Sequence, residues 1–329
     1  MVNILRSMAS LLAGMLISAL ISLYAPLICK DLTLQTLIGF LIVFLLLYGF
    51  GKISPLRWLY KLKKKFFTPV IGILSDMGWD PSNKQIYTWT DVSPEDWRNM
   101  LEKLARSEGI KIKVKLISAS KNFDPYTVVI NPYGAVYPEY DLESWGVVNK
   151  ILDYVRRGGL FVNVADIPCY YAYNPLLKKR LETAKPIYDI TPDGKVLRVN
   201  PFELAPLMEK LGLRVLAVER TELSKWDAEF EEKFRAIMGK VGKIEVHRVA
   251  IVEENVEPII KPREVTFLGS REKCTPLFFV NYGDGKFLIS LIFLNATDNS
   301  KKMKEVLSKM IIEIAKKPLK QGKRDAKIN

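Results

Sequence analysis

The chain has 329 residues, 49% of them hydrophobic, and a formal net charge of +13. One histidine and three cysteines without any CxxC spacing exclude a His-rich or cysteine-rich metal site, so we expect no metal and no cofactor. A net positive charge can indicate nucleic-acid binding, so the distribution of the charge along the chain matters.

Two long uncharged stretches open the chain, at residues 7–28 and 32–51. Each approaches or exceeds the roughly 20 apolar residues that a membrane-spanning helix needs. Only the short segment CKDL separates them, so they predict an antiparallel transmembrane hairpin over residues 1–51. A cleaved signal peptide is the alternative reading of the first stretch, but a complete second span follows it at once.

Basic residues crowd the segment that follows the second stretch. Residues 52–65 contribute a charge of +6, whereas the predicted hairpin tip holds only Lys30 and Asp31. By the positive-inside rule, we expect a two-helix membrane protein with both termini and the large domain on the cytoplasmic side. Residues 52–68 are then a basic juxtamembrane linker that meets the anionic lipids of the bilayer.

Small side chains recur every four residues in the first stretch, at Ser10, Gly14, Ser18 and Ser22. This spacing lines them along one helix face and allows another helix to approach closely. The second helix of the same hairpin is one partner for this face, and a second protomer in a homo-oligomer is the other.

The remaining charge lies mostly at the C-terminus. Residues 316–329 contribute +5 and residues 1–51 contribute +1, which leaves +1 for residues 66–315. A nearly neutral domain offers no broad phosphate-binding face, so we expect no nucleic-acid partner. Residues 317–329 are predicted to be a basic flexible tail.

Strand-like and helix-like segments alternate from residue 69 to 316, which predicts an α/β domain with a mostly parallel, doubly wound sheet. Strands are expected in PVIGILSD, IKIKVKLIS, YTVVINPYG and LFVNVAD, the second at an edge and the last in the middle of the sheet. SPEDWRNMLEKLARSEG carries N-cap and C-terminal glycine signals of a helix, and DLESWGVVNKILDYVRRGG a glycine stop. Further on, a helix and then a strand are expected in LAPLMEKLGLRVLAVE, and a helix is expected in TELSKWDAEFEEKFRAIMG. Two strands are expected to flank GDG, and a helix closes the domain.

YTVVINPYG, the helix ending in YVRRGG, the strand LFVNVAD and the late PLFFVNYGDGKFLISL together resemble the class I glutamine amidotransferase-like superfamily. The likeness is to its non-catalytic branch, found in ThuA-like proteins and in the trimerisation domain of some β-galactosidases. It covers about residues 69–316. A plain flavodoxin-like domain is the competing fold.

The resemblance also implies where a nucleophile would lie. In the catalytic members a glycine-flanked nucleophile directly follows the strand after the double glycine, and Ala165 and Asp166 occupy that place here. Cys169 lies three residues beyond, without the glycines, and His247 lacks the glutamate that follows the family's histidine two residues on. A thiol without a base is a poor nucleophile, so we predict no catalytic residue and expect Cys169 to be dispensable.

Ligands of open α/β sheets bind outside the carboxyl ends of the strands. The candidate ligand-binding residues at the predicted strand ends are Asp76, Trp79, Asn131, Tyr133, Gly134, Asp166, Cys169 and Tyr170. With Tyr171 and Tyr173, the aromatic residues among them form a wall for a sugar or peptide, or pack beneath the loops.

Two functions are compatible with these residues. One is a membrane-anchored scaffold or sensor whose cytosolic domain binds a small ligand or a protein partner without catalysis. The alternative is a hydrolase or sugar-processing enzyme that uses Asp76 and Asp166 as an acid–base pair. Strand-end aspartates more often cap helices or hold loops.

Overall fold

The computed structural model describes residues 68–80, 90–181, 188–190, 197–199, 206–217, 225–238, 241–246, 248–267, 270–294 and 298–316. All of them belong to the second of two units into which the chain divides, Thr68–Asn329. The predicted hairpin with its small-residue stripe, the linker up to residue 67, the tail and His247 lie outside the described residues. None of the described helices combines the length and the apolar character required to cross a bilayer.

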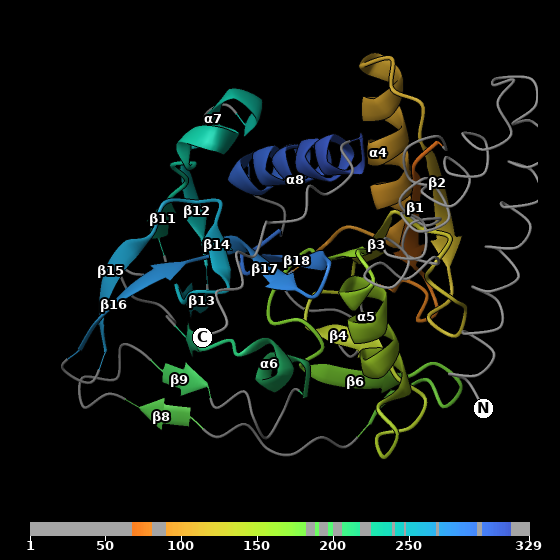
Figure 1. The fold of residues 1–329 in the computed structure, drawn as a ribbon, viewed down its shortest axis with the longest axis horizontal. Coiled ribbons are helices and arrows are strands. Elements are labelled where there is room, and N and C mark those ends of the chain that lie inside the picture. Colours follow the sequence, from red (N-terminus) through yellow and green to blue (C-terminus); the bar gives the residue numbers. More distant parts are fainter. Residues whose placement is uncertain are drawn as a thin grey trace, which may run out of the picture. The chain divides into compact units, whose positions relative to one another are not determined.

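A seven-stranded sheet forms the centre of this unit (Figure 1). Its strands, in spatial order, are β14 (Val256–Pro258), β17 (Leu277–Tyr282), β18 (Gly285–Ser290), β5 (Leu160–Asn163), β3 (Val128–Asn131), β1 (Val70–Leu74) and β2 (Lys113–Ile117). The five strands from β18 to β2 are parallel, and β17 and β14 extend the sheet by antiparallel pairing. The predicted α/β fold with a large, mostly parallel sheet is therefore confirmed, with β2 at an edge and β5 inside.

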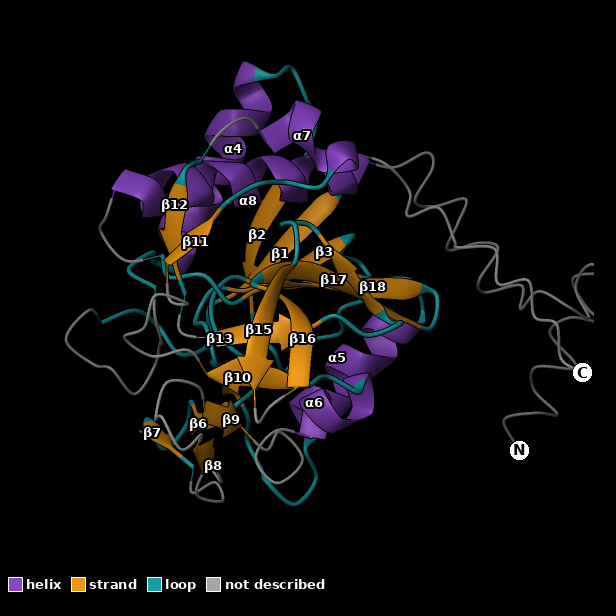
Figure 2. Cartoon of the chain, turned by 90° about the vertical axis from the view of Figure 1, so that its left-hand side faces the viewer, coloured by secondary structure: helices purple, strands orange, loops and turns teal. Residues whose placement is uncertain are grey.

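Helices cover both faces of this sheet. Figure 2 shows α4 (Pro94–Ser107), α7 (Glu232–Met238) and α8 (Asp298–Lys316) on one side, and α5 (Gly146–Arg156) and α6 (Pro206–Leu211) on the other. The side chains of β5 alternate accordingly: Leu160 and Val162 belong to the core under α4 and α8, and Phe161 belongs to the core under α5. A strand that is apolar on both faces needs such a double cover.

Local signals place the helix α4 as the sequence predicts. The Ser93 hydroxyl accepts a hydrogen bond from the Asp96 N–H at 3.0 Å, and the Asp96 carboxylate accepts one from the Ser93 N–H. This capping box satisfies N–H groups that the first turn would leave unpaired. The helix stops before Gly109, whose φ of +66° is readily available only to glycine.

The two segments that carry the family resemblance contact each other. In the β17–β18 turn, the Asp284 N–H donates to the Arg156 carbonyl at the end of α5, and the Lys286 N–H donates to the Gly159 carbonyl. A Cβ on Gly285 would lie 2.2 Å from the Val155 carbonyl oxygen. A Cβ on Gly283 would likewise lie 2.7 Å from the Arg156 carbonyl oxygen, so both glycines of YGDGK are needed for this close approach.

A second, antiparallel sheet was not predicted. It has the order β15 (Arg263–Phe267), β16 (Ser270–Thr275), β13 (Arg248–Ile251), β10 (Val215–Ala217), β9 (Leu197–Val199) and β8 (Tyr188–Ile190). A three-stranded sheet comprises β4 (Val136–Pro138), β6 (Tyr171–Asn174) and β7 (Lys179–Arg180). Most of these strands are too short to leave a periodic signal in the sequence.

The helix expected in TELSKWDAEFEEKFRAIMG is wrong in its first half. Lys225–Asp227 forms β11, which pairs with β12 (Lys243–Glu245), and the helix α7 begins only at Glu232. Burial alternates strictly from Lys225 to Phe230, with Trp226, Ala228 and Phe230 buried. A period of two indicates an extended chain, so the sequence held the signal for this strand.

Candidate functional site

The polar side chains at the carboxyl ends of the parallel strands form two clusters. The first surrounds Asp76, which follows β1; the second surrounds Asp166, which follows β5. The strand β3 lies between β1 and β5, so the two aspartates do not follow neighbouring strands. At 4.7–4.9 Å per strand, the two strand ends lie roughly 10 Å apart.

The Asp76 cluster consists of Asp76, Ser118, Ser120 and Tyr140. One carboxylate oxygen of Asp76 accepts hydrogen bonds from the Ser118 hydroxyl and, at 3.0 Å, from the Tyr140 hydroxyl; the other accepts from the Ala119 N–H at 2.8 Å. The hydroxyl oxygens of Ser118 and Ser120 are 2.7 Å apart. Ser120 is exposed and the other three residues are partly exposed, so a carboxylate with three hydroxyl groups reaches the surface here.

A lysine and two aromatic residues border this cluster. The Lys150 ammonium donates to the carbonyl oxygens of Ala119 and Ser120 at 2.6 and 2.9 Å. Desolvation lowers the pKa of Lys150, against the opposing charges of Asp76 and Glu139. The Trp79 ring lies 6.4 Å from the ring of Tyr133; burial, aided by the Asp76 charge, raises the pKa of the Tyr133 hydroxyl far above its usual value.

A chain of amides connects the ends of β3 and β5. The Asn131 amide donates to the Asn163 side-chain oxygen at 2.8 Å and to the carbonyls of Gly134 and Val136. The Asn163 amide in turn donates to the carbonyls of Ala165 and Asp166. Both asparagines are fully buried, so they hold the turns that follow the strands.

Asp166 follows shortly after β5, at the position where the resemblance noted in the sequence would lead one to expect a nucleophile. Its φ is +61°, a left-handed conformation that is uncommon for a residue with a side chain. Its carboxylate accepts from the Ile167 N–H at 2.8 Å and forms an ion pair with the Arg248 guanidinium at 2.5 Å. The Asp166 and Arg248 side chains are only 3% and 10% exposed, so the pair is closed off from solvent.

Cys169 lies in a second left-handed turn, at φ +55°, and is fully buried. Burial raises the pKa of its thiol, and the nearby charge of Glu139 adds to this effect. Glu139 is itself buried and accepts from the N–H groups of Tyr140 and Val147, the latter in the first turn of α5. Desolvation raises the pKa of Glu139 despite these hydrogen bonds. A buried protonated thiol is a poor nucleophile.

The expected aromatic wall is mostly interior. Tyr133, Tyr170 and Tyr173 are buried, while Trp79 and Tyr171 remain partly exposed. Tyr171 packs edge-on against Tyr170, and the Arg180 guanidinium lies 4.3 Å from the centre of the Tyr171 ring. Of the predicted residues, Asp76, Trp79 and Tyr133 come together, and Asn131, Gly134 and Asp166 join through the amide chain.

Sequence reasoning missed several partners: Ser118, Ser120, Tyr140, Lys150, Glu139, Asn163 and Arg248. Ser118 is the last residue of the predicted edge strand and could have been found by the strand-end rule. Arg248 lies on a strand of the unpredicted sheet, and no local pattern marks it. Among the described residues no group of three or more His, Cys, Asp or Glu side chains is placed to hold a metal ion.

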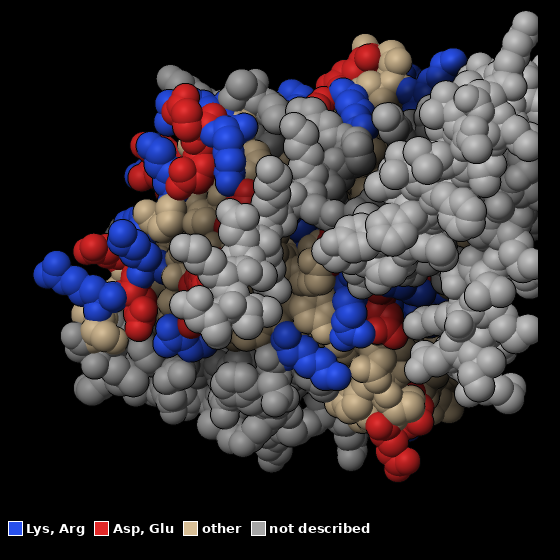
Figure 3. Space-filling model, in the orientation of Figure 1, with Lys and Arg blue, Asp and Glu red and all other residues tan. Residues whose placement is uncertain are grey.

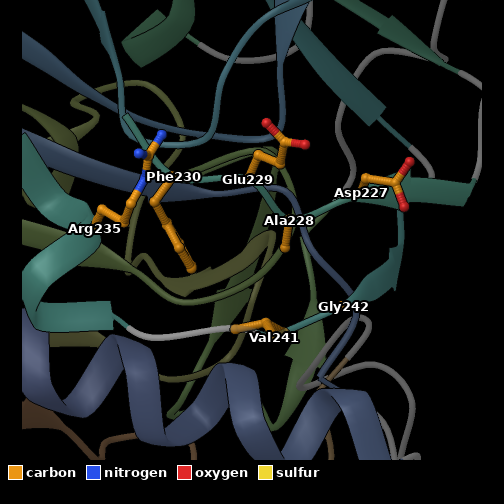
Figure 4. Close-up of a pocket in the computed structure, with 7 residues that line it drawn as sticks. All are labelled: Asp227, Ala228, Glu229, Phe230, Arg235, Val241 and Gly242. Carbon is orange, nitrogen blue, oxygen red and sulfur yellow. The ribbon is translucent and has the colours of Figure 1, made fainter. Parts of the chain in front are cut away.

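A separate hollow of about 600 Å³ lies between β11, α7 and residues 241–242. Figure 4 shows Ala228 and Phe230 pointing toward Val241, whereas the Glu229 carboxylate points the other way. Arg235 at its border pairs with Glu232, and Glu229 pairs with Lys261. On the face shown in Figure 3, acidic and basic side chains are intermixed near this region. The hollow does not include the strand-end clusters.

No family model matches the chain, and no curated protein matches it. Solved structures similar to it include a β-galactosidase from Rahnella sp. R3 (15% identity, TM-score 0.40, covering 75% of this chain and 31% of that chain). A β-galactosidase from Bacillus circulans sp. alkalophilus has 13% identity, a TM-score of 0.40 and coverages of 84% and 35%. An exo-β-1,4-mannosidase from Opitutaceae bacterium strain TAV5 has 10% identity, a TM-score of 0.34 and coverages of 75% and 36%. The chain spans about a third of the length of these proteins, and these similarities assign no role to any residue.

Proposed function

We propose that the chain is a membrane-anchored binding protein whose cytosolic α/β unit recognises a small ligand rich in hydroxyl groups at the Asp76 cluster and performs no catalysis. The anchor is the hairpin predicted over residues 1–51. The unit is a non-catalytic relative of the amidotransferase-like fold, and the protein acts as a sensor or scaffold.

The observation that carries this proposal is the composition of the Asp76 cluster. A partly exposed carboxylate accepts hydrogen bonds, and the hydroxyls of Ser118, Ser120 and Tyr140 can both donate and accept them. Trp79 adds a partly exposed apolar ring. A few convergent polar groups beside an aromatic surface suit a sugar or another polyol. The chain passes from β1 to β2 on one side and then to β3 on the other side of β1, so the strand order reverses at β1. Asp76 follows shortly after β1, and ligands of open α/β sheets usually bind at such a reversal.

The arrangement around Asp166 supports the non-catalytic part of the proposal. A general acid or base must reach the substrate, and the Asp166 carboxylate already engages Arg248 and Ile167 in a buried position. Cys169 is buried as well, with its pKa raised. The two residues closest to the family's nucleophile position are therefore occupied by internal contacts.

A panel of monosaccharides, disaccharides and polyols, measured by the shift in melting temperature and then by calorimetry, tests this function. We expect one class of polyol to raise the melting temperature of the full-length protein in detergent. Asp76→Asn and Trp79→Ala should each abolish the shift, while Glu264→Gln, an exposed carboxylate on β15, should leave it unchanged.

Two results would contradict the proposal. If the Asp76 and Trp79 variants respond like the wild type, the ligand does not bind at this cluster. If the wild type instead hydrolyses a glycoside and both Asp76→Asn and Asp166→Asn abolish turnover, the protein is the hydrolase of the alternative hypothesis.

A further inference from the structure

Three lysines lie on and just before β2, the edge strand of the main sheet among the described strands. Lys111, Lys113 and Lys115 are exposed, whereas Ile112 and Val114 between them pack against the core. Residues two apart in an extended chain share a face, so the three ammonium groups lie along one side of the segment 111–115. We call this row the Lys111–Lys115 face.

Nothing on the neighbouring strand balances this charge. Lys113 and Lys115 pair in register with Val70 and Gly72 of β1, neither of which is ionisable. None of the three lysines forms an ion pair with a described residue. The positive charge is therefore local, although residues 66–315 carry only +1 in total.

The face lies beside the first residues of the unit. The Lys113 N–H donates to the Pro69 carbonyl at 2.9 Å, and Lys113 pairs with Val70. Pro69 follows shortly after Lys65, the last residue of the basic segment that the sequence places at the membrane surface. These lysines therefore lie close to the point where the chain enters the unit.

We propose that the Lys111–Lys115 face docks onto the anionic cytosolic surface of the bilayer. This inference rests on the proposed membrane anchor. An anionic bilayer surface attracts each nearby basic residue, so three lysines along one side of the segment turn the edge strand β2 toward the lipid. Lysines on an edge strand also discourage pairing with foreign strands, and the experiment separates that role from lipid docking.

The experiment uses the full chain reconstituted into vesicles of phosphatidylcholine alone or mixed with phosphatidylglycerol. An amine-reactive reagent and mass spectrometry measure the reactivity of each lysine. We expect Lys111, Lys113 and Lys115 to react roughly fivefold more slowly in the anionic vesicles, the factor that corresponds to ~1 kcal/mol per basic residue. Lys225 of β11, across the unit from β2 in Figure 1, is exposed and should react equally in both. High salt should remove the difference.

A paired set of variants provides the second readout. Hydrogen exchange of the amides in 111–117 should slow in anionic vesicles for the wild type and for Lys301→Gln/Lys302→Gln on α8, but not for Lys113→Gln/Lys115→Gln. Equal reactivity in both lipids while the protein floats with the vesicles would overturn the docking and leave the anchor intact. Failure to float with neutral vesicles would refute the anchor itself. Protection only in native membranes, and not in purified lipid, would contradict docking to lipid and indicate a protein partner.

Discussion

The Asp76 and Asp166 clusters occupy equivalent places at the ends of parallel strands but differ in every property that matters for binding. Asp76 is partly exposed and accepts from neutral hydroxyls and one backbone N–H. Asp166 is buried, left-handed in conformation and paired with a buried arginine. The strand-end rule therefore finds candidate positions, while burial and the identity of the partner decide which of them can meet a ligand.

The two clusters also connect different parts of the molecule. Asp76 joins the loops after β1 and β2, two strands of one sheet. Asp166 joins the end of β5 to Arg248 of β13, and so links the main sheet to the second sheet. A contact of this kind contributes to the stability of the whole unit, whereas the Asp76 contacts order a local loop.

The largest effect is expected for Arg248→Met. The substitution removes one partner of a buried ion pair and leaves the Asp166 carboxylate without compensation, which destabilises proteins by about 3–5 kcal/mol. Urea unfolding followed by circular dichroism measures the loss. In the double variant Asp166→Asn/Arg248→Met the effect should be smaller than the sum of the single effects, because no isolated charge remains. Additive effects would show that the two side chains act independently.

Asp166→Asn should have the next largest effect on stability. It removes the charge that balances the buried Arg248, but the amide oxygen can still accept from the Arg248 guanidinium and the Ile167 N–H, so the expected loss is about 1.5–3 kcal/mol. The same unfolding measurement applies. A variant as stable as the wild type would mean that the Asp166 cluster is not the structural element described here.

Asp76→Asn should reduce stability by only ~1 kcal/mol, because the amide oxygen can keep part of the hydrogen bonds and the site is partly exposed. Its main consequence is the loss of the polyol-induced thermal shift. A loss of stability comparable to that of Arg248→Met would assign Asp76 to the structural framework instead.

The pH dependence of stability should reveal Glu139, which lies near Lys150 at the border of the Asp76 cluster and near Cys169. Because its folded pKa is above its unfolded value, the folded state holds the proton more tightly, and this contribution is lost as pH rises through the folded pKa. Glu139→Gln should therefore lose less stability than the wild type as pH rises from below 4.5 into the neutral range. Parallel pH profiles of the two proteins would contradict the assignment.

The smallest effect is expected for Glu264→Gln. The Glu264–Arg271 pair is exposed on both sides, and such pairs contribute roughly 0–1 kcal/mol. Its unfolding midpoint should stay close to that of the wild type, which makes it the reference for the variants above.

Sequence predicted six of the seven strands of the main sheet and the helices α4, α5 and α8 well, because their signals are local. The capping box of Ser93, the apolar run of β5 and the glycines at 158–159 can each be recognised within a few residues. The strand-end rule likewise placed Asp76, Asn131 and Asp166 at the correct edge.

The partners of these residues could not be predicted in the same way. Ser118 is 42 residues from Asp76, and Arg248 is 82 residues from Asp166, so only the assembled sheets bring them together. The short strands of the second sheet leave too few alternating positions to be read from sequence. Burial of Tyr133 and Tyr170 depends on the loops above them, which propensity does not describe.

Calorimetric binding of the polyol identified in the panel to the wild type, Asp76→Asn and Asp166→Asn, each measured below its own melting temperature, decides whether the Asp76 cluster is the ligand site. We expect Asp76→Asn to lose binding while remaining nearly as stable as the wild type. We also expect Asp166→Asn, although less stable, to bind with wild-type affinity. The reverse result, with affinity lost in Asp166→Asn and kept in Asp76→Asn, would contradict a ligand site at the Asp76 cluster.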